Sequence, residues 1–210
     1  MDTPAPSPAK VHPPILVITE VFSPSFCQWL IEQFESRGNE ASGTLRMEQG
    51  KMVHIADGET KRQRDHHVVD KDLLEAIGSR IERRVLPEIQ NAFHCDVRFV
   101  EKFKIVRYDA DVCGFFRPHR DNTTIGTAHR RFAMTLNLNT EEYEGGDLQF
   151  TDYGRASYHP ATGEAAIFSC NLLHEATDVT KGRRYTLLSF MYDESGRQFL
   201  ERYRDKGQAT

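Results

Sequence analysis

The second half of the chain consists of short segments that have the pattern of β-strands and are separated by turn residues. Residues 131–139 alternate apolar and polar side chains, and residues 144–150 pass through a Gly-Gly turn into another such segment. Residues 163–169 form a continuous apolar run, typical of a buried strand, and residues 184–190 form the last strand. This succession predicts that the region from about residue 99 onward is mainly β-structure.

The first half of the chain contains two segments with helical patterns. Residues 15–22 predict a first strand, after which Ser23 and Pro24 are typical of a helix start. A second helix is expected to begin at Asp70 and to be interrupted or kinked near Pro87. The apolar residues expected to face the core on these two helices are Phe26, Leu30, Ile31, Phe34, Leu73, Leu74, Ile77, Ile81, Val85 and Ile89.

These patterns suggest one catalytic domain with an integral helical flank, because 210 residues with 39% hydrophobic side chains can form one substantial core. We expect a disordered tail at 1–13, a helical support region at 14–98, a β-domain at 99–193 and a C-terminal tail at 194–210. Residues 38–69 are polar and weakly periodic, so we expect a long loop with short strands there, which would act as a mobile lid.

Four residues of the β-rich half point to a metal site. His119 and Asp121 follow a loop that contains glycine and proline, His174 follows a predicted strand, and Arg184 begins the last strand. Two imidazoles and one carboxylate are the ligands of non-haem Fe(II) oxygenases, and they leave positions open for a 2-oxo acid and O2. The alternative is that His174 is an ordinary core histidine and Arg184 a solvated cation.

The order of these parts resembles the prolyl 4-hydroxylase-like branch of the 2-oxoglutarate/Fe(II)-dependent dioxygenases. The motif residues are Tyr108, Gly114, His119, Asp121, Arg131, Thr135, Gly145, Gly146, His174 and Arg184. The similarity is strong from about residue 99 to 192 and loose before that. It implies a double-stranded β-helix, or jelly roll, buttressed by the two N-terminal helices.

The same resemblance implies the ligands and the reaction. His119, Asp121 and His174 would bind Fe(II), and Arg184 would pair with the distal carboxylate of the cosubstrate 2-oxoglutarate, with Thr186 and Tyr108 as further contacts. No catalytic residue is expected beyond the metal ligands. O2 would be the second cosubstrate, ascorbate an optional reductant, and succinate and CO2 the co-products of C–H hydroxylation.

The amino-acid composition limits the classes of binding partner that we expect. A net charge of −4 and a pI near 6.1 argue against a constitutive nucleic-acid binder. The basic runs 61–64 and 80–84 are either solvated faces or contacts for an acidic partner, and Arg62 and Arg64 could orient an anionic or peptidyl substrate. No apolar stretch is long enough to span a membrane, so we expect no membrane partner.

The four cysteines show no Cys-x-x-Cys spacing, and the first residues lack the basic and apolar regions of a signal peptide. We therefore expect a cytoplasmic protein. The sequence leaves the oligomeric state open.

Three functions remain open on the sequence. The leading hypothesis is a hydroxylase that acts on a free amino acid or a peptide, including a prolyl peptide. The others are a demethylase or repair oxygenase acting on a modified base or lysine, and a non-catalytic sensor of metal and 2-oxo acid. Asn137 and Arg184 stand where many prolyl hydroxylases have tyrosine and lysine, so the resemblance implies the cofactor chemistry but does not by itself indicate a prolyl substrate.

Overall fold

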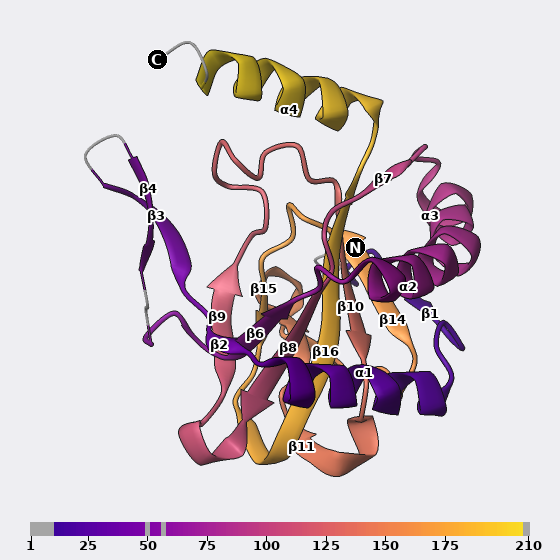
Figure 1. Ribbon diagram of the computed structural model, residues 1–210, viewed down its shortest axis with the longest axis vertical. Helices are drawn as coiled ribbons and strands as arrows, with labels where there is room; N and C mark the ends of the chain where they lie inside the picture. The colour runs from indigo at the N-terminus through magenta and orange to yellow at the C-terminus, as the bar shows by residue number, and fades with distance from the viewer. Residues whose placement is uncertain (1–10, 49–50, 56–57, 208–210) are drawn as a thin grey trace, which may run out of the picture.

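Two antiparallel β-sheets face each other, and helices cover the outer side of the larger sheet (Figure 1). The computed structural model describes residues 11–48, 51–55 and 58–207. Within these residues there are four α-helices and sixteen strands. No helix in this described part is long and apolar enough to cross a bilayer.

The larger sheet has nine strands among the described residues, and its long central strand β16 pairs with β10 on one side and with β8 on the other. Along the sheet the order of strands is β1 (Ile15–Ile18), β14 (Ala165–Ser169), β10 (Phe132–Asn137), β16 (Val179–Tyr192), β8 (Lys104–Asp109), β6 (Arg64–His67) and β2 (Glu40–Ala41). Two further strands, β11 (Tyr143–Gly145) and β7 (Phe99–Val100), pair with the two ends of β16.

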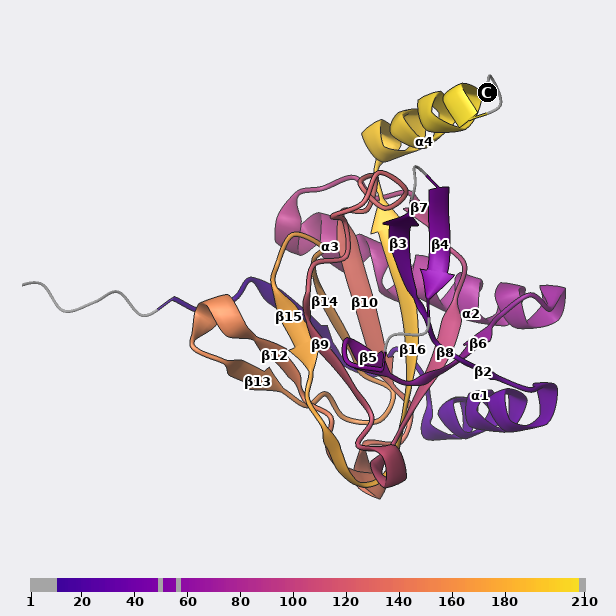
Figure 2. The same ribbon diagram turned by 90° about the vertical axis from the view of Figure 1, so that its left-hand side faces the viewer.

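The smaller sheet holds five strands in the described part of the chain, in the order β13 (Ala156–Tyr158), β12 (Leu148–Phe150), β15 (His174–Ala176), β9 (Phe115–His119) and β5 (Lys61–Arg62). Figure 2 shows this sheet on one side of the larger sheet, with α1 and α2 on the other. A separate hairpin, β3 (Thr44–Glu48) with β4 (Lys51–Ile55), pairs only with itself.

The two N-terminal helical segments begin at the predicted caps. The side chain of Ser23 accepts a hydrogen bond from the N–H of Phe26 at the start of α1 (Pro24–Arg37), and Asp70 does the same for Leu73 in α2 (Lys71–Arg84). The predicted interruption is confirmed, because α3 (Leu86–Phe93) is a separate helix. The remaining helices are α4 (Glu194–Gly207) and the 3-10 turns η1 (Ala110–Val112), η2 (Thr140–Glu142) and η3 (Thr151–Tyr153).

Alternation along β16 explains how one strand serves both the core and the site. Tyr185 and Leu187 are buried in the hydrophobic core with α1, α2 and α3, while Arg184 and Leu188 face the space between the sheets. Packing against the helices therefore stabilises the outer face of the larger sheet. The inner face of the same sheet lines a cavity between the two sheets.

The expectation of a mainly β fold with a helical flank is confirmed. The short strands expected within residues 38–69 are present as β2 to β6. Residues 194–207, expected as part of a C-terminal tail, form α4. Most of the expected N-terminal tail, residues 1–10, lies outside the described residues. The expected domain boundaries stay a prediction.

Candidate metal centre

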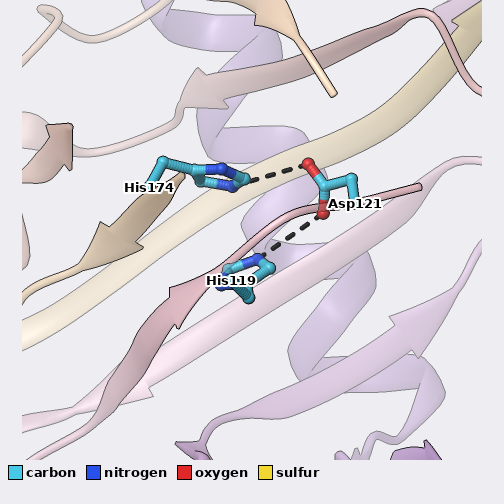
Figure 3. A group of neighbouring side chains, drawn as sticks. All are labelled: His119, Asp121 and His174. Carbon is cyan, nitrogen blue, oxygen red and sulfur yellow. Dashed lines mark ion pairs between the residues drawn. The ribbon is translucent and has the colours of Figure 1, made fainter. Parts of the chain in front are cut away.

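Three side chains predicted as metal ligands converge between the two sheets (Figure 3). His119 ends β9 and His174 begins β15, and the two residues are register partners in the smaller sheet. The Nε2 atoms of His119 and His174 lie 3.5 and 3.4 Å from the two carboxylate oxygens of Asp121. One donor atom from each residue lies within 4.8 Å of the others, and no other such group occurs among the described residues.

The hydrogen bonds of the two imidazoles fix the tautomer that a metal ion needs. Nδ1 of His119 lies 2.8 Å from the carbonyl of Arg117, and Nδ1 of His174 lies 3.0 Å from the carbonyl of Leu172. A carbonyl oxygen can only accept, so each Nδ1 carries the proton and each Nε2 presents its lone pair toward Asp121. Two lone pairs and a carboxylate that face one another repel unless a cation lies between them, so the three residues fit a metal ion.

Burial and aromatic packing hold these imidazoles in place. Phe116 stacks on His119 with ring centroids 3.5 Å apart, and Phe168 meets His174 edge-on at 4.6 Å. Burial lowers the pKa of His174 to about 4, so the ring is neutral at physiological pH, as a metal ligand must be.

A cavity of about 600 Å³, including its open mouth, joins this site to Arg184. Arg184 is only 4% exposed, and its Nη2 donates to Oδ1 of Asn137 at 3.1 Å and to the hydroxyl of Thr135 at 3.4 Å. Its Nε has no hydrogen-bond partner, and no carboxylate of the described residues pairs with its charge. An uncompensated buried guanidinium is costly, so this end of the cavity fits an anionic ligand such as a carboxylate.

Tyr108 and Thr186, the two further predicted cosubstrate contacts, lie close to Arg184, but only Tyr108 lines the cavity. Tyr108 is the register partner of Arg184 and lines the cavity, and burial raises the pKa of its phenol, which therefore stays protonated. Thr186 is fully buried, and its hydroxyl bonds to the carbonyl of Leu136 at 2.9 Å and to the hydroxyl of Thr135 at 2.8 Å. Thr135 lies on the cavity wall, whereas Thr186 lies behind it. The direct role of Thr186 stays a prediction.

The Gly-Gly turn makes room for Arg184. Gly146 has a φ of +67°, and a Cβ there would lie 2.9 Å from Cδ of Arg184 and 2.9 Å from Cγ2 of Val179. Only glycine fits both the backbone conformation and this close approach.

Sequence reasoning did not find three polar residues around the cavity. Gln63 and Lys104 line it, and Arg130 bonds to the main-chain carbonyl of Asp121 at 3.3 Å. Gln63 lies within the basic run 61–64 and Arg130 directly precedes the expected strand 131–139, whereas Lys104 lies in neither segment.

Comparisons with known proteins agree with this geometry. Residues 103–192 match the 2OG-Fe(II) oxygenase superfamily. The chain is 28% identical over 182 residues to procollagen-lysine,2-oxoglutarate 5-dioxygenase 1 of Mus musculus, which corresponds to 81% of this chain and 23% of that protein. The chain thus spans about a quarter of the length of that relative.

Solved structures share the fold at low identity. A prolyl hydroxylase of Trichoplax adhaerens in complex with a hypoxia inducible factor peptide has a TM-score of 0.70 at 13% identity, over 88% of this chain and 86% of that one. The collagen prolyl hydroxylase of Paramecium Bursaria Chlorella virus-1, in complex with 2OG, has a TM-score of 0.63 at 14% identity, over 84% and 94%.

The two-sheet fold and the converging histidines and carboxylate agree with the family match over residues 103–192. Residues 103–192 are thus similar to the 2OG-Fe(II) oxygenase superfamily, and the jelly roll of the chain resembles the prolyl hydroxylase structures. Fe(II), 2-oxoglutarate and O2 are the cofactor and cosubstrates that this family implies, and the donor set described above fits the first two.

Proposed function

We propose that this protein is an Fe(II)- and 2-oxoglutarate-dependent dioxygenase that hydroxylates an unactivated C–H bond of an amino-acid side chain, free or within a peptide. One observation carries the proposal. A single cavity is lined both by three residues whose metal-ligand atoms converge and by a buried arginine without a carboxylate partner among the described residues. The three convergent ligand atoms lack a positive charge, which a metal ion would supply. The buried arginine lacks a negative charge, which the carboxylate of a 2-oxo acid would supply.

The roles of the residues follow from their chemistry. His119, Asp121 and His174 would hold Fe(II), and Arg184 would bind the distal carboxylate of 2-oxoglutarate. When bound, the iron supplies the redox chemistry that couples decarboxylation of 2-oxoglutarate, to succinate and CO2, with insertion of oxygen into a C–H bond.

The protein itself contributes position and a dry environment. Arg184 and Tyr108 fix the direction in which an anionic cosubstrate lies along the cavity, because both groups can only donate to its carboxylate. Leu148, Phe168 and Leu188 give the same cavity apolar walls, which would exclude water from the reacting atoms.

The substrate is a finer part of the proposal. The mouse relative is named a procollagen-lysine dioxygenase and the two similar structures are prolyl hydroxylases, which supports a peptidyl lysine or proline as substrate. We also propose that the protein acts in the cytoplasm, since all four cysteines are free.

The test is succinate release by the purified full chain with Fe(II), 2-oxoglutarate and air, in the presence of lysine- and proline-containing peptides. Mass spectrometry would detect one added oxygen atom on the peptide. Replacing His119, Asp121 or His174 with alanine should weaken Fe(II) binding and stop turnover. Full activity of His174→Ala would rule out the assigned metal site.

Two rival functions give different outcomes in the same assay. Release of formaldehyde from a methylated base or methylated lysine would favour a demethylase. Tight binding of Fe(II) and 2-oxoglutarate with no succinate release in the presence of any substrate would favour a non-catalytic sensor. Oxygen incorporation into a peptide contradicts both.

A further inference from the structure

A groove beside the metal cavity carries three cationic side chains that form no ion pair with a carboxylate of the described residues. The basic groove is defined by its lining residues, which are Ala41, Ser42, Gly58, Lys61, Arg62, Gln63, Arg64, Arg107, Asp109 and Val112. Arg107 pairs with Glu35 and Asp109, whereas Lys61, Arg62 and Arg64 form no ion pair with a described carboxylate. The groove is thus locally cationic on a chain of net charge −4.

Main-chain carbonyls and aromatic rings hold these cations without cancelling their charge. Nε of Arg62 donates to the carbonyl of Gly58 at 2.9 Å, and its guanidinium lies 5.2 Å from the ring centre of Phe115. Nη2 of Arg64 donates to the carbonyl of Asn39 at 2.9 Å. A cation that is oriented but not neutralised remains available to an anionic ligand.

Gln63 lies where the basic groove meets the metal cavity, and it lines both. It is 7% exposed, and it connects β5 of the smaller sheet to β6 of the larger sheet. Its Nε2 donates to Oδ1 of Asp65 at 2.7 Å and lies 3.4 Å from the hydroxyl of Ser42. Because a carboxylate only accepts, Asp65 fixes the orientation of the amide, and Oε1 of Gln63 is left without a partner.

Two lysines connect the groove to the metal ligands. Nζ of Lys61 lies 5.2 Å from the ring centre of Phe116, the ring that stacks on His119. Nζ of Lys104 donates to Oδ2 of Asp65 at 2.9 Å on the wall of the metal cavity. A ligand that extends from the groove past Gln63 would therefore enter the cavity that the candidate metal ligands line.

We infer that the basic groove binds an extended acidic segment of a peptide substrate, and that Oε1 of Gln63 accepts a main-chain N–H where the peptide enters the metal cavity. The inference rests on the proposed function and names its substrate class. A peptide supplies both partners that the site lacks: carboxylates for Arg62 and Arg64, and an N–H for the buried carbonyl of Gln63. β5, at the edge of the smaller sheet, runs along the groove, which suits an extended chain.

The experiment measures peptide binding separately from turnover. Two fluorescein-labelled peptides, each about 12 residues long and so extended over about 40 Å, would differ only in having glutamate or glutamine at alternate positions. Fluorescence anisotropy would report their binding to the full chain with Fe(II) and 2-oxoglutarate, without oxygen, at low and high salt. A single-stranded oligothymidylate of similar length would be titrated in parallel.

Three variants separate the contributions. Arg62→Glu with Arg64→Glu should weaken binding of the glutamate peptide by about tenfold and remove its salt dependence, while the glutamine peptide is unaffected. Gln63→Met should weaken both peptides by the same factor at all salt concentrations. The control, Lys71→Glu with Arg83→Glu on the exposed side of α2, makes the same change in net charge and should leave binding within twofold.

The inference is overturned if the glutamine peptide binds as well as the glutamate peptide, if neither binds, or if the control double variant loses as much affinity. Tighter binding of the oligothymidylate than of the acidic peptide would overturn it too. Failure of the proposed function is distinguishable, because succinate release and binding of 2-oxoglutarate are measured without reference to this groove.

Discussion

The guanidinium of Arg130 donates a hydrogen bond of 3.3 Å to the main-chain carbonyl of Asp121, and so connects a candidate metal ligand to the larger sheet. Its Nε and Nη2 donate to the two carboxylate oxygens of Glu101 at 2.8 Å, and its Cζ lies 3.6 Å from the ring centre of Phe190. His129 also bonds to Glu101, at 2.7 Å. This bidentate, partly buried arrangement restricts the position of Asp121.

Arg130→Gln should therefore weaken Fe(II) binding by about tenfold, because outer residues that orient metal ligands typically contribute tenfold or more to affinity. The measurement is Fe(II) titration in the absence of oxygen, together with thermal unfolding of the metal-free protein. A merely structural role would lower the unfolding temperature and leave Fe(II) affinity unchanged.

Arg120→Gln is the matched control for this prediction. Arg120 lies between the candidate ligands His119 and Asp121 in sequence, but its side chain bonds to Asp152 and to the carbonyl of Asn171. It should leave Fe(II) affinity within twofold. An equal loss in both variants would contradict a specific role for Arg130.

Arg184→Ala should raise the requirement for 2-oxoglutarate by one to two decades, roughly 1.5 to 3 kcal/mol for a charge-assisted hydrogen bond. Arg184→Lys should raise the 2-oxoglutarate requirement by a smaller factor than Arg184→Ala, since an ammonium keeps the charge but cannot form the same forked contact. Fe(II) affinity should hardly change. Titration with 2-oxoglutarate checks this, with Arg183→Ala as control, because Arg183 points away from the cavity and pairs with Asp109. Unchanged affinity in Arg184→Ala would place the cosubstrate elsewhere.

Gly146→Ala should lower both stability and cosubstrate affinity. A left-handed alanine costs about 1 to 2 kcal/mol, and its Cβ would displace Arg184. Urea unfolding and 2-oxoglutarate titration measure the two effects. Gly126→Ala is the control, since φ is not positive there and its Cβ would meet no atom within 4 Å. Normal cosubstrate affinity in Gly146→Ala would show that Arg184 does not depend on this turn.

The helix caps, the main strands and the residues of the candidate metal site could be predicted from sequence because their signals are local, while metal binding itself stays a prediction. His119 and Asp121 have the right ligand chemistry within one motif, and Ser23 and Asp70 cap the helices that follow them. The start of β16 at Val179, ahead of the expected strand at 184–190, was not predictable, because the polar run before Arg184 pairs with β11.

The supporting polar groups could not be predicted, because their partners are distant in sequence. Gln63 and Lys104 meet only through Asp65, when β6 pairs with β8. Thr135 and Thr186 both face inward, and only the register of β10 against β16 places Thr135 on the cavity wall with Thr186 behind it. A period-two pattern indicates which residues share a face of a sheet but not which of them fronts a cavity.

Binding of an acidic peptide should fall as the pH rises through about 8. Burial and the nearby positive charge of Lys104 together lower the pKa of Lys61 to about 8, while Asp65 opposes the shift. The side chain of Lys61 is therefore positively charged below about pH 8 and neutral above it. Anisotropy titrations of the acidic peptide between pH 7 and about 9.5 check this. The control is Lys61→Met, which should bind the peptide more weakly and with an affinity that does not change with pH in this range. A flat profile in the unmodified protein would exclude Lys61 from the groove contacts.

Hydrogen exchange should divide residues 38–69 into two parts. β5 and β6 pair with β9 and β8, so their amides should be strongly protected before any ligand is added. β3 and β4 pair only with each other, and an isolated two-stranded hairpin is marginally stable, so their amides should exchange faster. If the hairpin closes over the site, adding Fe(II), 2-oxoglutarate and an acidic peptide in turn should slow its exchange only at the last step. Strong protection of the hairpin in the absence of ligands, unaltered by all three, would show that it is scaffold and that closure does not involve it.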